Sequence, residues 1–152
     1  MKKICFAASS GGHYEQLLML KPLMKKYDSF IVTEETPYFK KPDEIKTYLL
    51  KQTNRKELTF LPYIIINLFR SLKIYIKEKP DIIITTGVLS VIPLCLICKM
   101  FHKKLVYIES FAKISSPTKT GKFLYRFSDR FYVQWPTMLE FYPNAIYLGG
   151  IY

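Results

Sequence analysis

The hydrophobic residues of this chain fall into short continuous runs that are separated by amphipathic stretches. A run of about 4–8 apolar residues between turn residues is typical of a strand that is buried on both faces of a parallel sheet. On this basis we predict strands at residues 3–8, 29–33, 82–86, 104–109, 131–134 and 145–148.

The amphipathic stretches predict helices at residues 14–26, 61–79, 90–101 and 122–129. In the helix at 61–79, apolar residues recur three and four positions apart, and Pro62 lies in the first turn. This apolar stripe is wider than one core face requires, and Arg70 and Lys73 stand at its polar edge. Residues 36–54 form a long polar connection with at most one short strand.

The order of these elements predicts the fold class. A strand, a glycine turn, a helix and a second strand within the first 33 residues form a βαβ unit, which requires a parallel sheet and a right-handed crossover. We therefore predict an α/β protein with a single Rossmann-like, doubly wound parallel sheet. Residues 1–152 are expected to form one domain.

Composition and net charge indicate which kinds of molecule the chain is suited to bind. Apolar residues make up 49% of the chain and aromatic residues 16%, which excludes an intrinsically disordered protein. Lysine and arginine total 23 against 12 acidic residues, and the net charge of +11 predicts an anionic partner. Because the basic residues are interleaved with apolar ones rather than gathered in runs, the pattern favours a membrane surface over nucleic acid. A soluble lysine-rich protein is the alternative interpretation.

The cysteines and the lengths of the apolar runs indicate in which cellular compartment the protein is located. Cys5, Cys95 and Cys98 are an odd number without a disulfide framework, which favours a reducing cytosol. No second cysteine pair or nearby ligand accompanies Cys95 and Cys98, so we interpret both as small buried side chains rather than zinc ligands. The first apolar run is too short for a signal peptide, and no window reaches the roughly 18–20 apolar residues of a spanning helix. We expect a cytoplasmic protein that contacts the membrane peripherally.

Ligands of an open parallel sheet bind beyond the carboxyl ends of its strands. The first strand is followed by Ser9, Ser10, Gly11, Gly12 and His13. The glycines allow the backbone to turn tightly next to a ligand, and the start of the following helix favours phosphate. A neutral His13 at this position is suited to act as a general base. The alternative is a histidine that only caps the helix or packs against it.

Other strand ends supply further candidates. Thr86 and Gly87 stand at the end of the third predicted strand, and Glu109 and Ser110 stand at the end of the fourth. We expect the Glu109 carboxylate to project into the same crevice as His13, where it binds a polar ligand or pairs with a downstream cation. The basic residues between 113 and 130 are suited to a diphosphate or to lipid headgroups, or they form a solvated face.

Taken together, these residues resemble a known family. The motifs are Ser-Ser-Gly-Gly-His at 9–13, Thr-Gly at 86–87, Glu-Ser-Phe-Ala at 109–112, Thr-Gly-Lys at 120–122 and Asp-Arg-Phe-Tyr-Val-Gln-Trp-Pro at 129–136. They are similar to bacterial capsule and exopolysaccharide subunits of the PssD/CpsF type. These are relatives of the eukaryotic membrane-anchoring subunit of the two-part N-acetylglucosaminyltransferase for dolichol-linked N-glycan precursors. The resemblance extends over essentially the whole chain, from residue 3 to residue 150.

The resemblance implies one half of a split enzyme. Such subunits are similar to the N-terminal domain of a GT-B glycosyltransferase, bind the membrane and a polyprenyl-diphosphate-linked sugar acceptor, and pair with a separate subunit that binds the UDP-sugar donor. It implies neither a metal nor another cofactor, no nucleic acid, and attachment to the cytoplasmic face of the cell membrane. The eukaryotic relatives carry an N-terminal membrane helix, whereas this chain begins at its first strand. Its attachment is therefore expected to be peripheral, through the helices at 61–79 and 90–104, of which the latter is equally suited to the core.

The expected roles of individual residues follow. His13 and Glu109 compete for the role of catalytic base. We expect acceptor contacts at Ser10, Gly11, Gly12, Thr86, Gly87 and Ser110, membrane or diphosphate contacts at Arg70, Lys73, Lys122 and Arg126, and a surface facing the partner at Trp135, Gly149 and Gly150. The donor sugar, the acceptor sugar and their linkage do not follow from the sequence.

Two other functions fit parts of the pattern. A small or homodimeric glycosyltransferase would transfer sugar without a partner, although a second βαβ set with a nucleotide pocket is missing from the sequence. A basic nucleic-acid-binding module would place aromatic residues on an exposed sheet face, whereas here they populate helices and buried strands.

Overall fold

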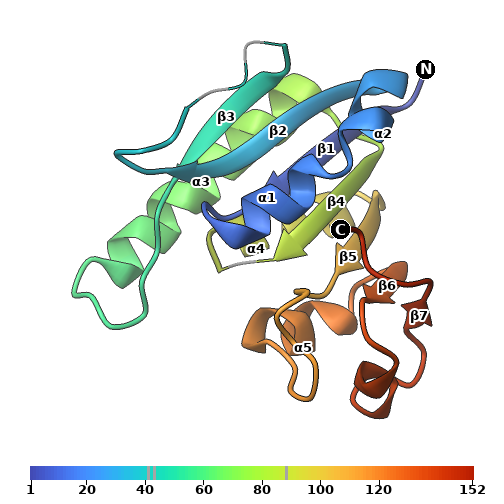
Figure 1. Ribbon diagram of the computed structural model, residues 1–152. Helices are drawn as coiled ribbons and strands as arrows, with labels where there is room; N and C mark the ends of the chain where they lie inside the picture. Colours follow the sequence, from blue (N-terminus) through green and yellow to red (C-terminus); the bar gives the residue numbers. More distant parts are fainter. Residues whose placement is uncertain (41, 43, 88) are drawn as a thin grey trace.

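A single parallel sheet organises the molecule (Figure 1). The structure is a computed structural model that describes residues 1–40, 42, 44–87 and 89–152, and the strands within these ranges are ordered β3-β2-β1-β4-β5-β6-β7. Every neighbouring pair is parallel. The strands are β1 (Lys3–Ala8), β2 (Asp28–Glu35), β3 (Lys46–Lys51), β4 (Ile82–Gly87), β5 (Lys104–Ile108), β6 (Arg130–Val133) and β7 (Ile146–Tyr147). The chain runs outward from β1 to β3, returns to the centre and then runs outward from β4 to β7, which confirms the predicted doubly wound arrangement.

Helices cover both faces of the sheet (Figure 1). Side chains of α1 and α2 pack on one face, and side chains of α3, α4 and α5 pack on the other. The helices are α1 (Gly12–Leu18), α2 (Lys21–Lys26), α3 (Phe60–Glu78), α4 (Ile92–Met100) and α5 (Lys119–Tyr125), together with the short 3-10 helices η1 (Leu89–Val91) and η2 (Pro136–Glu140).

The core consists of two apolar layers, one on each face of the sheet. Along β1, Cys5 and Ala7 point into the layer under α3 and α4, whereas Phe6 and Ala8 point into the layer under α1. Alternate residues therefore enter opposite layers, and burial on both faces accounts for the continuous apolar runs of the sequence.

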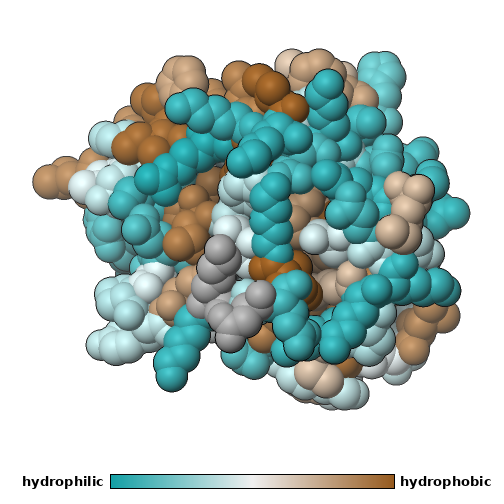
Figure 2. Space-filling model, turned by 90° about the horizontal axis from the view of Figure 1, so that it is seen from above, coloured by the Kyte–Doolittle hydropathy of each residue, from teal (hydrophilic) through white to brown (hydrophobic). Residues whose placement is uncertain are grey.

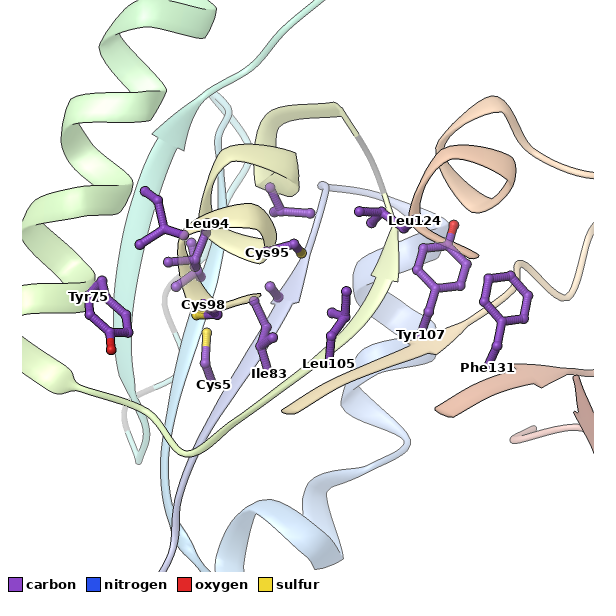
Figure 3. Packing of buried hydrophobic residues seen from close by; sticks show 14 of the residues in the cluster. Cys5, Tyr75, Ile83, Leu94, Cys95, Cys98, Leu105, Tyr107, Leu124 and Phe131 are labelled. Carbon is purple, nitrogen blue, oxygen red and sulfur yellow. The ribbon is translucent and has the colours of Figure 1, made fainter. Parts of the chain in front are cut away.

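The cysteines lie in the larger of these layers. Figure 3 shows Cys5, Cys95 and Cys98 among aliphatic and aromatic side chains. All three are completely buried and free, which confirms the prediction of small apolar side chains for Cys95 and Cys98. Burial raises the pKa of the Cys98 thiol to about 12, so the thiolate that metal binding and disulfide exchange require is disfavoured.

The predicted helix at 14–26 is two helices. The first ends at Leu18, and the second starts at Lys21 with Pro22 in its first turn. Proline has no N–H to donate, and its ring collides with the carbonyl of the residue four positions earlier in a continuous helix. The prediction of one helix was wrong because this single residue overrides the amphipathic pattern around it.

The longest helix, α3, exposes most of its leucine, isoleucine and phenylalanine residues. Its buried residues are Asn67, Ser71, Ile74, Tyr75 and Glu78, three of which are polar. Leu61 is 68% exposed and Phe69 is 61% exposed. The exposed apolar residues, which we call the α3 stripe, are Leu61, Ile65, Ile66, Leu68, Phe69, Leu72 and Ile76. Apolar side chains of the predicted core stripe thus face outward. Figure 2, a view from above, shows hydrophobic residues in brown next to hydrophilic residues in teal on the surface.

The neighbouring helix, α4, is part of the core. Leu94, Cys95 and Cys98 are completely buried, so the middle of the predicted helix at 90–101 packs against the sheet rather than facing a membrane. No helix within the described ranges is long and apolar enough to span a membrane. The predicted polar connection at 36–54 contains β3, and its residues 41 and 43 lie outside the described residues.

Candidate active site

The turn between β1 and α1 presents glycines at an open surface. Gly11 precedes α1 with φ 73° and ψ −142°, a backbone conformation that favours glycine. Its carbonyl accepts hydrogen bonds from the N–H groups of Tyr14 (2.9 Å) and Glu15 (3.0 Å), which starts the helix. A Cβ built on Gly11 or Gly12 would meet no atom within 4 Å. The turn therefore leaves open space next to its backbone, and the predicted acceptor contacts at these two residues stay a prediction.

His13 and Thr86 are brought together across this turn. His13 Nδ1 lies 2.8 Å from the backbone oxygen of Thr86, and the Thr86 hydroxyl donates to the backbone oxygen of His13 at 2.8 Å. A carbonyl oxygen only accepts, so Nδ1 must carry the proton in this contact. The neutral imidazole then has its lone pair on Nε2, which accepts no hydrogen bond within the described part of the chain. This is the tautomer that a base acting through Nε2 requires.

Gly87 is held against the neighbouring strand. It has φ 105°, and a Cβ at this position would lie 2.6 Å from the hydroxyl oxygen of Tyr107 on β5. The Gly87 N–H donates to the Thr85 hydroxyl at 3.0 Å. Glycine is therefore required here by close packing, which orients the backbone that carries Thr86.

Glu109 is buried and enclosed by hydrogen-bond donors. Its side chain accepts from the N–H of Ser110 (2.9 Å), the N–H of Thr118 (3.2 Å), the Thr118 hydroxyl (2.9 Å) and the Tyr142 hydroxyl (2.7 Å). Burial, together with the Glu109 carboxylate, raises the pKa of Tyr142, which keeps its hydroxyl protonated as a donor. Glu109 thus differs from the expectation that its carboxylate lines the crevice of His13, because the residue is 0% exposed and its oxygens are already occupied.

The Glu109 carboxylate anchors the start of α5 instead. Thr118 caps this helix by accepting the N–H of Gly121 at 2.8 Å while its hydroxyl donates to Glu109. A Cβ built on Gly121 would collide with Glu109 Oε2. The helix therefore begins at Lys119, whereas the sequence predicted a start at residue 122. The Thr-Gly-Lys motif places its glycine where the Glu109 carboxylate approaches the helix.

A second acidic residue, Glu34, lies beside the glycine turn and was missed in the sequence. It is the second-last residue of β2 and is buried, and its Oε2 is 3.4 Å from both the backbone nitrogen and the hydroxyl of Ser10. The contact places Ser10 within the turn. The only hint in the sequence is the position of Glu34 at the carboxyl end of a strand next to the first one.

Two glutamines that were not among the predicted site residues join the carboxyl ends of the strands. Gln134 Nε2 donates to Gln16 Oε1 on α1 (2.9 Å) and to the backbone oxygen of Glu109 (2.9 Å). Gln16 Oε1 also accepts the N–H of Phe111, at 3.2 Å. Ile151 N–H donates to Gln134 Oε1 at 3.0 Å. This network fixes α1, which carries His13, to the segments that follow β5 and β6.

Two of the residues predicted to face a partner, Trp135 and Gly150, lie against Phe111. The indole N–H of Trp135 donates to the backbone oxygen of Phe111 at 2.7 Å, and the two rings are 5.0 Å apart. A Cβ on Gly150 would lie 3.2 Å from the Phe111 ring, and Tyr152 packs edge-on against the same ring. Trp135 and Gly150 thus contact a common residue, and Gly149 has φ 94° in the segment between β7 and this contact.

The predicted diphosphate contacts are divided between two helices. On α3, Arg70 donates to the backbone oxygen of Leu49 at 3.2 Å, and Lys73 is exposed. On α5, Lys122 and Arg126 are exposed, and they do not join the two α3 residues in one cluster of ion pairs or hydrogen bonds within the described ranges. The structure also brings together no group of three His, Cys, Asp or Glu side chains that could hold a metal ion, as far as the described residues extend.

A family model covers most of this scaffold. The model described as "Oligosaccharide biosynthesis protein Alg14 like" matches residues 51–151, which is more than half of the chain. The chain belongs to this family. The Alg14-like match includes Glu109, Thr118 and Gln134, whereas the turn with His13 precedes it. Most of the hydrogen-bonded scaffold thus lies inside the matched region, whereas Gln16, Glu34 and the candidate base His13 precede it.

Curated relatives of the Alg14-like family match shorter segments. The UDP-N-acetylglucosamine transferase subunit ALG14 of Rattus norvegicus is 37% identical over 81 residues, which cover 49% of this chain and 38% of the relative. The corresponding subunit of Schizosaccharomyces pombe is 41% identical over 75 residues, which cover 46% of this chain and 36% of the relative. The chain spans about two fifths of the length of the curated relatives it matches.

Solved structures extend the comparison to nearly the whole Alg14-like chain. MurG of Acinetobacter baumannii has a TM-score of 0.70 at 18% identity, and the aligned region covers 90% of this chain and 42% of the MurG chain. UDP-N-acetylglucosamine 2-epimerase from Rickettsia bellii has a TM-score of 0.74 at 14% identity, and the aligned region covers 99% of this chain and 45% of the epimerase. Identities at this level show the fold alone. It is the Rossmann-like fold of the N-terminal domains of GT-B glycosyltransferases, as predicted.

Proposed function

We propose that this chain is the acceptor-binding subunit of a two-part glycosyltransferase in bacterial capsule or exopolysaccharide synthesis. Membership of the Alg14-like family carries the proposal, because the curated relatives are named as subunits of a UDP-N-acetylglucosamine transferase. The acceptor is a sugar linked to polyprenyl diphosphate at the cytoplasmic face of the cell membrane. A separate subunit binds the UDP-sugar donor and completes the site.

In this function His13 is the general base. The acceptor hydroxyl attacks C1 of the donor sugar, and its proton moves to His13 Nε2 as the new oxygen–carbon bond forms. The bond between C1 and the phosphate oxygen breaks, and UDP leaves with the electron pair. The contact of Nδ1 with the Thr86 oxygen supports this role because it leaves Nε2 unprotonated in the neutral ring. The open space at Gly11 and Gly12 accommodates the acceptor sugar. Glu109 takes no part in the step and holds α5 in place.

The α3 stripe is the membrane surface of the subunit. Water-exposed leucine, isoleucine and phenylalanine side chains of this density are unfavourable on a monomer, whereas they are favourable at the boundary between lipid headgroups and acyl chains. Lys73 and Lys77 are exposed on the same helix and are suited to anionic headgroups. The contact is peripheral, since the helix lies on the bilayer and does not cross it.

The partner subunit docks at the β5–β7 side of the sheet. An apolar groove of about 440 Å³ lies on the face of α1 and α2, and Val106 and Tyr132 at its floor are only half-buried. Gly149, Gly150 and Ile151 form one wall of this groove. An apolar groove next to exposed backbone favours docking of an amphipathic segment from another chain. The rings of Trp135 and Tyr152 both pack against the ring of Phe111, which lies next to Gly150 of this wall.

A reconstituted transfer assay tests the function. The purified chain is assayed with a polyprenyl-diphosphate-sugar acceptor and a panel of UDP-sugars, alone and with the product of a neighbouring glycosyltransferase-like gene. We expect transfer only with the partner. Transfer by the chain alone would establish a self-sufficient enzyme. Binding to RNA at near-physiological salt without binding to anionic vesicles would instead favour a nucleic-acid-binding module.

His13→Asn in this assay tests the base. Asparagine keeps an N–H for the Thr86 oxygen but has no basic nitrogen, so kcat is expected to fall by about 100-fold or more while the acceptor KM stays within about threefold. His102→Asn is the matched control, because His102 is exposed at the end of α4 with φ 58°, which asparagine tolerates, and should change kcat by less than about twofold. A His13→Asn enzyme within about tenfold of the unmodified pair would contradict the assignment.

A further inference from the structure

An open pocket of about 730 Å³ lies between the β3–α3 loop and the start of α5, beside the carboxyl ends of β2 and β3. In Figure 1 the loop is at the lower left, next to the first turn of α3. Its volume lies within the range of pockets that hold small ligands. The charged residues that line this basic pocket are Glu35, Lys51, Arg55, Lys56, Glu57 and Lys119.

The basic pocket has more positive than negative charge. Lys51 pairs with Glu35 at 2.9 Å, which neutralises one residue of each sign. Glu57 accepts hydrogen bonds from two neutral side chains of its own loop, Asn54 at 3.1 Å and Thr59 at 3.3 Å. Within the described part of the chain, the remaining cations Arg55, Lys56 and Lys119 form no ion pair with any carboxylate. These cations come from two separate segments, so an anion placed between them is attracted from both sides.

The basic pocket adjoins the α3 stripe. Tyr63 of α3 lines the pocket, and Ile66, three positions further along the same side of the helix, is an exposed member of the stripe. Leu58, in the loop that lines the pocket, is also fully exposed. A polar cavity with cationic walls thus lies next to apolar side chains that are exposed. This combination is suited to an amphiphile with a strongly anionic head and a long hydrocarbon tail.

We propose that the basic pocket binds the diphosphate of a membrane-embedded isoprenoid diphosphate, whose hydrocarbon chain lies along the α3 stripe. The inference rests on the proposed function and specifies where the acceptor is held. It assigns the diphosphate to Arg55, Lys56 and Lys119, which is a different set from the Arg70, Lys73, Lys122 and Arg126 expected from the sequence. Arg55 supplies a planar guanidinium for two phosphate oxygens, and the two lysines supply point charges.

Vesicle binding with a double variant tests the site. The probe is a neutral phosphatidylcholine vesicle containing undecaprenyl diphosphate, compared with vesicles of equal surface charge made with phosphatidylglycerol. For the intact chain we expect tighter binding to the diphosphate vesicle. Arg55→Ala with Lys56→Ala should weaken that binding by about tenfold or more and remove the preference over phosphatidylglycerol. Lys119→Ala, on the opposite wall, should give a smaller loss in the same direction.

The matched control removes equal charge elsewhere. Lys25→Ala with Lys26→Ala lies on α2, which Figure 1 shows at the opposite end of the sheet, and should leave the preference for diphosphate unchanged. Equal losses on both kinds of vesicle for both double variants would overturn the proposal in favour of a general electrostatic surface. Inhibition by free inorganic pyrophosphate or by UDP alone, with no preference for the lipid diphosphate, would overturn it in favour of a soluble-ligand site.

The transfer assay separates this proposal from the proposed function. If the reconstituted pair transfers sugar and the Arg55 and Lys56 double variant keeps the acceptor KM, the function stands and the basic pocket is not the acceptor site. If no partner gives transfer while the diphosphate preference depends on Arg55 and Lys56, the pocket stands and the function fails.

Discussion

Helices α3 and α4 pack side by side on the same face of the sheet, and both are rich in apolar residues, but they use them in opposite ways. In α4, Leu94 and the two cysteines point inward and form part of the core. In α3, Asn67 and Glu78 point inward together with Ile74 and Tyr75, and most of the leucine, isoleucine and phenylalanine residues point outward. Apolar content alone therefore does not determine which side of a helix the core receives.

Two of the buried polar residues of α3, Asn67 and Glu78, face inward toward strong hydrogen-bond partners, whereas the buried Ser71 hydroxyl has none among the described residues. Asn67 accepts the N–H of Lys51 and donates to the Lys51 carbonyl, both at 2.8 Å. Glu78 accepts from Lys3 at 3.0 Å, and also from Lys46 and Tyr48. A buried polar group that keeps its hydrogen bonds costs little, so α3 can dock through its polar side and leave its apolar side for another environment.

The largest effect is expected from truncation in α4. Leu94→Ala removes a completely buried side chain and should lower the free energy of unfolding by about 3 kcal/mol. Leu68→Ala in α3 makes the same change at a half-exposed position and should cost less than about 1 kcal/mol. Urea unfolding of both variants measures the difference. Equal losses would show that α3 is packed with its apolar side inward, as α4 is.

The next largest effect on stability is expected from Glu78 on the polar side of α3, and it should depend on pH. Although burial alone would raise the pKa of Glu78, hydrogen bonds from Lys46, Tyr48 and Lys3 lower it from 4.5 to about 2. A carboxylate with a depressed folded-state pKa stabilises the fold above the unfolded value, so this stabilisation is complete above about pH 4.5 and is lost as the pH falls toward 2. Glu78→Gln should therefore cost on the order of 2–3 kcal/mol at pH 7 and much less near pH 2.

Urea unfolding at pH 7 and near pH 2.5 tests this. Glu44→Gln is the control, since Glu44 forms an exposed pair with Lys25 at 3.5 Å and its substitution should have little effect at either pH. A Glu78→Gln penalty that is the same at both pH values would exclude the ion-pair explanation.

The smallest effect on stability should accompany a large effect on binding. Phe69→Ser in the α3 stripe should change the free energy of unfolding by less than about 0.5 kcal/mol, because Phe69 is mostly exposed, and should weaken binding to anionic vesicles several-fold. Met19→Ser, at a half-exposed position on the other face of the sheet, should change neither quantity. Vesicle co-sedimentation with a thermal melt of each variant gives both measurements. Intact binding by Phe69→Ser would remove the α3 stripe from the membrane contact.

Most of the sheet could be predicted because its strands carry a local pattern. The runs that form β1, β2 and β4 are apolar at consecutive positions, and both of their faces are buried. The orientation of α3 could not be predicted in this way. Periodicity distinguishes two sides of a helix, but the partners of Asn67 and Glu78 lie on β1 and β3, far away in the sequence.

In the candidate site, too, the features that depend on a local motif could be predicted, and those that depend on residues distant in the sequence could not. The open glycine turn and the position of His13 follow from a short motif directly after a strand. The side chain of Glu109 could not be placed, since the direction in which it points is set by Thr118 and Tyr142, which come later in the chain. Gln16 and Gln134 are 118 positions apart, and their contact follows only from the folded sheet.

The contact between Asn67 and Lys51 also bears on self-association. β3 is an edge strand, and the unpaired backbone of an edge strand can recruit a strand from another molecule. Asn67 occupies both backbone groups of Lys51, and lysines stand at both ends of the strand. At the opposite edge, β7 has only two residues to offer. If the α3 stripe concentrates the chain on a membrane as proposed, neighbouring molecules would meet at high local density, and these short or blocked edges would disfavour strand pairing between them.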